Sequence, residues 1–185
     1  AEADKVTYVG LWRELLMEAA YEVPLVLSIF AMAILYGTDL SAAGAQWPPG
    51  ALLNPLAFAA FFVSGAMATS RMPFEIPDAD AEIVFGPYTE YGSSPLLLAF
   101  GAKYVELYAL SLLGAVLFLG GWAPLGGWAG AALVAAKAGA LTAAWLFLRA
   151  VYPRMRIDQA LRFGWRWMLL MAAASVALSA ILRLW

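Results

Sequence analysis

The sequence predicts an all-α fold, a polytopic membrane protein with about five transmembrane helices and a long acidic cytoplasmic loop. Of its 185 residues, 64% are hydrophobic and only 13% are charged, and the mean hydropathy is +0.77. Soluble domains are closer to half apolar and about a quarter charged. The apolar residues also gather in stretches of roughly 20, the length that an α-helix needs to cross the hydrocarbon core of a bilayer.

The five predicted spans follow a mixed polar and apolar segment, residues 1–20, which lacks the basic start and cleavage site of a signal peptide. They lie at about 21–37, 51–69, 96–119, 128–151 and 167–184. Segments containing Gly, Pro and Trp separate the first span from the second and the third from the fourth. We interpret 1–185 as a single membrane domain, with an acidic loop at 70–95 and a basic loop at 149–166.

The distribution of Lys and Arg predicts the orientation, because cytoplasmic loops of membrane proteins are enriched in these residues. Residues 1–20 and the two long loops fall on one side of the membrane and carry Lys5, Arg13, Arg71, Arg149, Arg154, Arg156, Arg162 and Arg166. The opposite side carries only Arg183. This asymmetry places the N-terminus and both loops in the cytoplasm and agrees with an odd number of spans.

The composition excludes several kinds of site. The chain has no Cys, so it supplies no disulfide, thiolate metal site or iron–sulfur ligand, and it has no His, the commonest metal and haem ligand. We therefore predict no metal site and no cofactor on this chain, so that any redox centre belongs to a partner. A net charge of -2 also argues against a nucleic acid partner.

Charged residues inside the predicted spans are the first functional signal, because each costs roughly 2.5–3.5 kcal/mol to insert. Glu22 opens the first span, and Lys103 and Glu106 lie three residues apart on one face of the third. Lys137 lies deep in the fourth span without a partner in its own helix. Lys103 and Glu106 could simply neutralise each other. Lys137 must face the bundle interior, a file of water or an acid of another span.

The acidic loop is the second signal. Its carboxylates are crowded along an otherwise apolar stretch that includes Phe74, and they are Glu75, Asp78, Asp80, Glu82 and Glu90. A loop this apolar is expected to fold back against protein at the membrane edge. Crowded, desolvated carboxylates exchange protons readily, which suits a proton relay. A solvated loop, or one that docks on a basic partner, is the alternative.

The basic loop allows two interpretations. Its arginines could lie among anionic lipid head groups. They could instead form salt bridges that hold a peripheral subunit or the acidic loop.

Motifs in these segments resemble one known family. RMPFEIPDADAE at 71–82 resembles the RTPFDLPEAEAE signature of the quinone-site membrane subunit of respiratory complex I. Thr89, Glu90 and Tyr91 resemble its TEYSG motif. Further matches, in the same order, are YEVP at 21–24, LFLGGW at 117–122 and RAVYPRMRIDQ at 149–159, which resembles RATxPRxRYDQ. The resemblance covers nearly the whole chain and extends to the homologous subunit of group 4 membrane-bound NiFe hydrogenases.

The resemblance implies a membrane-arm coupling subunit of a proton-translocating oxidoreductase. Its partners would be the peripheral-arm redox subunits, antiporter-like membrane subunits and the lipid bilayer, with an iron–sulfur cluster in a partner and a quinone at the interface with the peripheral arm. The membrane would be the cell membrane of a prokaryote or the mitochondrial inner membrane. The hydrogenase branch would use ferredoxin or a similar donor and no quinone.

The resemblance and the depth of the charged residues in the spans together assign roles to residues. The predicted proton path comprises Glu22, Glu75, Asp78, Asp80, Glu82, Glu90, Glu106 and Lys137. The predicted contacts to partner subunits and the quinone region are Arg71, Phe74, Tyr91, Arg149, Arg154, Arg156 and Asp158. No residue of this chain is expected to carry out redox chemistry itself.

Several residues depart from the family's motifs, and they leave open whether this chain belongs to the complex I branch or to the hydrogenase branch. Ala68 replaces the Glu of the family's AETNR segment, and Lys103 replaces the Glu of its AEY segment. EIVFGPYTEY at 82–91 is closer to the hydrogenase branch. The family's N-terminal helices are missing, so we expect a partner chain to supply them, with a split gene or a fragment as explanations.

Two interpretations from other classes compete with the coupling subunit. A small secondary transporter would use the buried charges to bind substrate, but the sequence lacks the inverted repeat of many transporters. A plain membrane anchor would not need buried charges. Identifying what copurifies with the chain would separate the three.

Overall fold

A computed structural model of the protein describes residues 5–37, 39–45, 47–70, 73–75 and 92–184. Within these ranges all regular structure is helical, which confirms the predicted all-α class. In chain order the helices are α1 (Lys5–Tyr36), α2 (Leu40–Gly44), α3 (Gly50–Leu53), α4 (Pro55–Ala68), α6 (Ser93–Leu117), α7 (Gly127–Val151), α8 (Ile157–Arg162), the π-helix η2 (Phe163–Met168) and α9 (Leu169–Leu184).

Among the described residues, four helical stretches are long and apolar enough to cross a membrane, which makes the chain an integral membrane protein. They are Tyr8–Tyr36, Ser93–Leu117, Gly127–Val151 and Ile157–Leu184. The fifth apolar helix, α4, has 14 residues. At 1.5 Å per residue it is about 21 Å long, shorter than the roughly 30 Å hydrocarbon core.

Helix α1 differs from the predicted first span, which began at residue 21. It begins at Lys5 and runs unbroken for 32 residues, past Pro24. The polar side chains of residues 13–18 hid this extension, because a hydropathy criterion stops at charges. Leu, Met, Glu and Ala are nevertheless good helix formers. Glu22 was predicted to lie at the end of its helix and instead lies in the middle of α1.

The predicted second span, 51–69, is interrupted at Asn54, between α3 and α4. Pro55 disfavours helical geometry at the preceding residue, and Asn54 has φ -135° and ψ 81°. The Asn54 side chain accepts a hydrogen bond from the Ala57 N–H at 3.0 Å and so caps α4. Its amide also donates to the Ser175 carbonyl and the Ser179 hydroxyl, both at 2.8 Å, which joins α4 to α9.

The predicted basic loop, 149–166, is also largely helical. Only residues 152–156 separate α7 from α8, and α8 continues through η2 into α9. The last helical stretch therefore begins about ten residues before the predicted span at 167. Arg162 and Arg166, which masked this start in the hydropathy pattern, lie on the helix.

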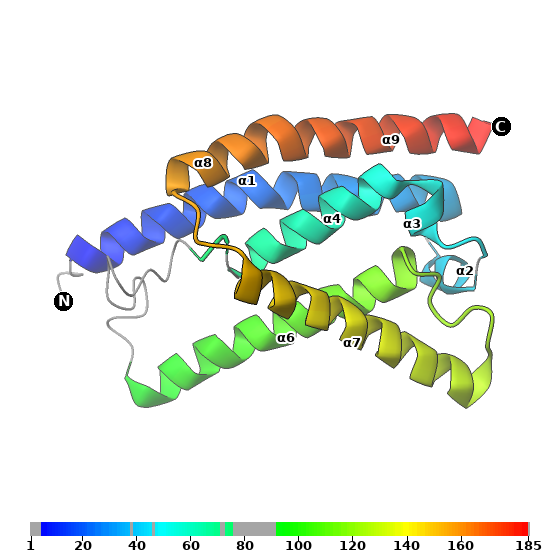
Figure 1. Ribbon diagram of the computed structural model, residues 1–185, viewed down its shortest axis with the longest axis horizontal. Helices are drawn as coiled ribbons and strands as arrows, with labels where there is room; N and C mark the ends of the chain where they lie inside the picture. The colour runs from blue at the N-terminus through cyan, green and yellow to red at the C-terminus, as the bar shows by residue number, and fades with distance from the viewer. Residues whose placement is uncertain (1–4, 38, 46, 71–72, 76–91, 185) are drawn as a thin grey trace.

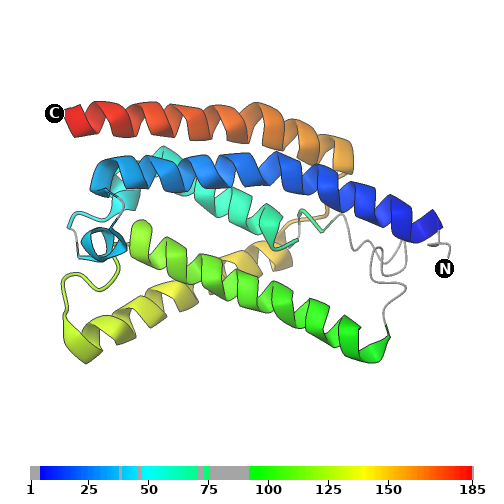
Figure 2. The same ribbon diagram turned by 180° about the vertical axis from the view of Figure 1, so that it is seen from behind.

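The helices form two groups (Figures 1 and 2). Helices α1, α4 and α9 run side by side, and α6 and α7 cross each other on one side of them. At one end of the bundle, here called the acidic end, α1 begins, α4 ends, α6 begins and α7 ends. At the opposite end, the turn end, α1 ends, α2 and α3 lie, and a turn connects α6 to α7.

Helix α4 is the centre of the fold and connects the two groups. Phe61 and Trp145 of α7 are both fully buried, and the Trp145 ring stacks on Phe62 with 5.6 Å between centroids. The Trp145 indole N–H donates to the Phe62 carbonyl at 2.9 Å. Gly65 lets the indole approach closely, since a Cβ there would lie 2.7 Å from it.

The turn end is tightly packed. Gly121, with φ +45°, lies so close to Gly44 that an added Cβ would be 2.5 Å from the Gly44 Cα. The Trp122 N–H donates to the Gly44 carbonyl at 3.0 Å. Lys137 reaches this turn from α7, and its ammonium donates to the carbonyls of Leu119 and Gly121 at 2.7 Å and of Ala123 at 3.3 Å.

Candidate functional site: an acid-lined cavity at the acidic end

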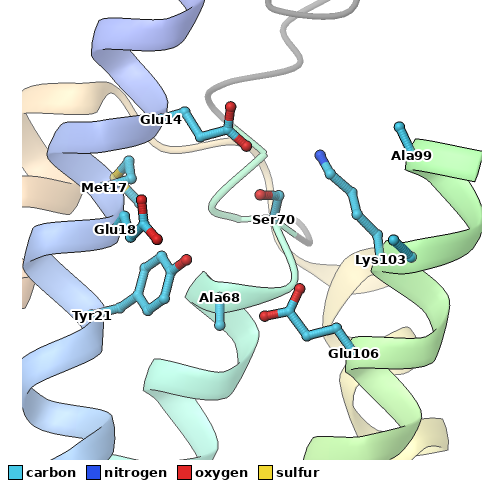
Figure 3. Close-up of a pocket in the computed structure, with 10 residues that line it drawn as sticks. Glu14, Met17, Glu18, Tyr21, Ala68, Ser70, Ala99, Lys103 and Glu106 are labelled. Carbon is cyan, nitrogen blue, oxygen red and sulfur yellow. The ribbon is translucent and has the colours of Figure 1, made fainter. Parts of the chain in front are cut away.

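A cavity of about 350 Å³ lies at the acidic end, between α1, the end of α4 and α6. Figure 3 shows its walls, and the lining residues are Glu14, Met17, Glu18, Tyr21, Ala68, Ser70, Ala99, Ala102, Lys103 and Glu106. Three carboxylates, one ammonium and two hydroxyl groups thus meet in one hollow.

The α1 wall consists of residues at helical spacing. Glu14, Glu18 and Tyr21 are four and three residues apart, so they follow one face of the helix. Figure 3 shows their polar ends directed toward the cavity. Met17 is 2% exposed and anchors this face against the core.

The α6 wall carries the charge pair that the sequence singled out. Lys103 and Glu106 project from one face of α6 toward α1 and Ser70 (Figure 3). Ala99 and Ala102 lie on the same wall, and their small side chains leave space beside Lys103. The predicted placement of Lys103 and Glu106 on one helix face is therefore present in the structure.

The end of α4 closes the cavity between the two walls. Thr69 is the C-cap of α4, and its hydroxyl and its backbone N–H both donate to the Gly65 carbonyl, at 3.0 and 3.1 Å. Ser70 has φ 47°, a left-handed conformation that is uncommon for a residue other than Gly. This turn directs the chain away from α4 and leaves Ser70 at the cavity.

Groups of this kind can pass protons. Burial, neighbouring carboxylates and neighbouring cations together decide which protonation state of a carboxyl group is favoured. Among the described residues, no cluster of three His, Cys, Asp or Glu side chains could hold a metal ion. The cavity therefore offers acid–base groups rather than a metal site in the part of the chain that the structure describes.

The beginning of the acidic loop docks on the segment between α7 and α8. Phe74 is 5% exposed and stacks on Phe163 with 6.2 Å between ring centroids. The Met155 N–H donates to the Pro73 carbonyl at 2.9 Å. A guanidinium nitrogen of Arg149 lies 3.9 Å from a carboxylate oxygen of Glu75, and the two side chains are 41% and 27% exposed. One ion pair between the basic and acidic segments, the alternative to lipid contact, is thus present.

The other predicted site residues divide into four groups. Glu22 is exposed on α1, four residues beyond Glu18, and does not line the cavity. Lys137 is at the turn end, hydrogen-bonded to carbonyls. Exposed Arg156 and Asp158 begin α8, with half-buried Arg154 just before. Outside the described residues lie Arg71, Asp78, Asp80, Glu82, Glu90 and Tyr91.

Sequence reasoning missed Glu14, Glu18 and Tyr21. Residues 1–20 were interpreted as a polar segment ahead of the first span, so their acids were not assigned to a membrane helix. The available signal was the spacing of Glu14, Glu18 and Tyr21, which places all three on one face if the helix extends backward.

Comparison with known proteins decides the family. The sequence model of the NADH dehydrogenase family matches residues 1–180. The chain belongs to the NADH dehydrogenase family. This confirms the resemblance that the motifs indicated. The NADH-quinone oxidoreductase subunit named H in Geobacillus kaustophilus is 33% identical over 100% of this chain and 57% of its own length.

Other members give the same picture. The counterpart of that subunit in Bacillus cytotoxicus is 32% identical over 99% of this chain and 57% of its own length. The counterpart in Dehalococcoides mccartyi is 35% identical over 96% of this chain and 50% of its own length. The chain therefore spans little more than half the length of these relatives of the NADH dehydrogenase family.

A solved structure also matches. A chain of the membrane-bound sulfane sulfur reductase, an archaeal respiratory membrane complex, superposes with a TM-score of 0.79 at 29% identity. The match covers 98% of this member of the NADH dehydrogenase family and 61% of the archaeal chain. The arrangement of helices thus recurs in a complex named for a different substrate.

Proposed function

We propose that this chain is a membrane-arm coupling subunit of a complex I-type proton-translocating oxidoreductase, and that the acid-lined cavity takes up and passes on the protons. The observation that carries the proposal is the meeting of Glu14, Glu18 and Glu106 with Lys103 in one hollow. These groups come from two different helices, so a relative shift of α1 and α6 would change how they interact. Family membership supports the assignment to such a complex.

The proposed path starts on the acidic loop and leads inward. The loop begins at Glu75 and carries Asp78, Asp80, Glu82 and Glu90, and α4 and α6, which flank it, both border the cavity. From the loop a proton would enter at Glu14 and Glu18 and cross to Glu106. Glu22, one helical turn beyond Glu18, would continue the path along α1. Lys137 was also predicted on the path, but it is not part of this proposal, because its ammonium donates to three backbone carbonyls at the far end of the bundle.

The partners and cofactors follow from the same proposal. The redox centres lie in other subunits, with an iron–sulfur cluster in the peripheral arm and a quinone at the interface with it. Of the residues predicted to contact that arm, Arg156 and Asp158 are exposed at the acidic end and would do so together with Arg71 and Tyr91. Phe74 is buried against Phe163 and Arg149 pairs with Glu75, so these two would act by holding the start of the acidic loop in place, with half-buried Arg154 beside them in the chain segment that contacts the loop. Antiporter-like subunits, and helices equivalent to the rest of the relatives' length, would complete the membrane arm.

A second candidate is the corresponding subunit of a hydrogenase-type or sulfur-reducing respiratory complex without a quinone. The match to the sulfane sulfur reductase favours it, as does Lys103 in place of the Glu of the complex I-type motif. Identifying the copurifying subunits distinguishes the two candidates, because a NADH-oxidising flavoprotein belongs to the first and a NiFe-type large subunit to the second.

Glu→Gln substitutions in the assembled complex test the cavity's role, because Gln keeps the size and removes the titratable charge. Electron transfer and proton uptake would be measured together in membrane vesicles. Glu18→Gln and Glu106→Gln should lower coupled turnover at least about tenfold while the complex still assembles. Glu22→Gln and Glu82→Gln test the outer members of the path in the same way.

Asp39→Asn is the matched control, because Asp39 is an exposed carboxylate at the turn end whose loss should leave coupling unchanged. Normal coupled rates in both Glu18→Gln and Glu106→Gln would mean that the cavity's carboxylates are structural and that protons travel elsewhere.

A further inference from the structure

A second hollow at the acidic end is apolar. Its volume is about 510 Å³, and its lining comes from α4, the start of the acidic loop, the end of α7 and η2. The lining residues are Phe62, Val63, Ala66, Pro73, Phe74, Leu148, Tyr152, Pro153, Met155 and Phe163. We call this hollow the apolar groove.

Arginines are next in sequence to several of the residues that line the apolar groove. Arg149 follows Leu148, Arg154 lies between Pro153 and Met155, Arg156 follows Met155, and Arg162 precedes Phe163. Four arginines are thus direct chain neighbours of lining residues. In the described segments that form the groove they outnumber the carboxylates, Glu75 and Asp158. An apolar hollow whose lining segments carry an excess of arginine matches a ligand that has an apolar tail and an anionic head.

The groove lies where such a ligand would be found. Tyr152, Trp165 and Trp167 are 54%, 50% and 63% exposed, and exposed Tyr and Trp mark the level of the lipid head groups. Along α4 the lining extends from Ala66 back to Phe62, a depth of about 6 Å at 1.5 Å per residue. The groove therefore begins near the head-group level and extends into the hydrocarbon layer.

We propose that the apolar groove binds one acyl chain of an anionic phospholipid of the cytoplasmic leaflet, with the arginines of its lining segments holding the phosphate. Each Arg near an anionic membrane surface strengthens binding about fivefold. The acyl chain would pack against Phe74, which lies next to Glu75. The bound lipid would thus hold the start of the acidic loop against α7 and η2, beside the acid-lined cavity.

Photolabelling of the assembled, membrane-extracted complex tests the site directly. The probes are phosphatidylglycerol and phosphatidylcholine, each with the same diazirine-bearing acyl chain, and mass spectrometry locates the labelled residues. Phosphatidylglycerol should label peptides containing residues 62–66 and 148–155 at least about fivefold more than phosphatidylcholine. Leu148→Trp, which fills the groove, should reduce this labelling to background.

Arg162→Gln should lower phosphatidylglycerol labelling about fivefold, because it removes one arginine from the exposed surface without disturbing the core. Arg183→Gln, an equal loss of charge at the turn end, should leave it unchanged. Equal labelling by both lipids, or no effect of Arg162→Gln, would overturn the proposal. The proposal would also be overturned if these peptides carried no lipid label and a segment of another subunit crosslinked to the groove instead.

Discussion

Two lysines lie inside membrane-length helices, and their surroundings differ. Lys103 lines a cavity at the acidic end together with three carboxylates. Lys137, at the turn end, donates to three backbone carbonyls between residues 119 and 123, which uses all three ammonium hydrogens. The same residue type thus serves a candidate proton site at one end and fastens a turn at the other.

The difference extends to the packing around each lysine. Around Lys137, the turn between α6 and α7 is pressed against α2 through Gly121, Gly44 and Trp122, which leaves no room even for a methyl group. Around Lys103, Ala99 and Ala102 leave space beside polar groups. We infer that the turn end holds the helices in place. Under the proposed function, the acidic end would change its charge during turnover.

The largest effect is expected from crowding the turn end. Gly121→Ala would place a methyl group 2.5 Å from the Gly44 Cα at a backbone φ of +45°. We expect a loss of about 2–4 kcal/mol of stability, which would lower the amount of assembled complex. Quantitative native gels and a thermal melt measure this. Gly139→Ala on α7, with open space around the added methyl group, should be neutral or slightly stabilising.

A smaller effect is expected where α4 joins α9. Asn54→Ala removes the cap of α4 and both hydrogen bonds to α9 from a fully buried position. We expect a loss of about 2–3 kcal/mol, seen as a lower melting temperature of the complex. Ser179→Ala removes one of the two acceptors and should cost clearly less. Equal melting temperatures for wild type and Asn54→Ala would show that this junction does not hold the helices together.

The ion pair between the two long loops should contribute less. Arg149 and Glu75 are 3.9 Å apart and partly exposed, so solvent screens their attraction. Arg149→Gln should change stability by less than about 1 kcal/mol. A double-mutant cycle with Glu75→Gln, read by thermal melting, isolates the pair. A coupling well above that value would mean that partner subunits bury the pair.

The smallest effect is expected at Asp39, the cap of α2. Hydrogen bonds from the Ser41 hydroxyl and N–H hold the pKa of the Asp39 carboxyl below its usual range. A lowered pKa stabilises the fold above the unfolded pKa, and this contribution is lost as the pH falls through the folded pKa. Asp39→Asn should keep the cap and remove only this acid sensitivity, measured as melting temperature against pH. If Asp39→Asn changed coupled turnover, the conclusion that Asp39 serves only to cap α2 would be contradicted.

The sequence predicted the helical class, the shared face of Lys103 and Glu106 and the family. It did not predict where α1 begins, because charges at Glu14 and Glu18 lower the hydropathy of a stretch that is nonetheless helical. The partners of Lys137 were equally hidden. They are backbone carbonyls, which every residue has, so no side-chain pattern signals them. The break at Asn54 was readable in principle, since Pro55 follows it.

The two lysines allow the most direct test of whether the acidic end carries protons and the turn end carries structure. Lys103→Met and Lys137→Met would be compared in vesicles of the assembled complex, measuring protons translocated per electron and the amount of complex. Lys103→Met removes the ammonium group from a cavity that three carboxylates also line. It should lower translocation about tenfold or more at normal assembly. Lys137→Met should lower assembly, while the surviving complex keeps its normal ratio. Uncoupling by Lys137→Met at normal assembly, with normal coupling in Lys103→Met, would contradict the account.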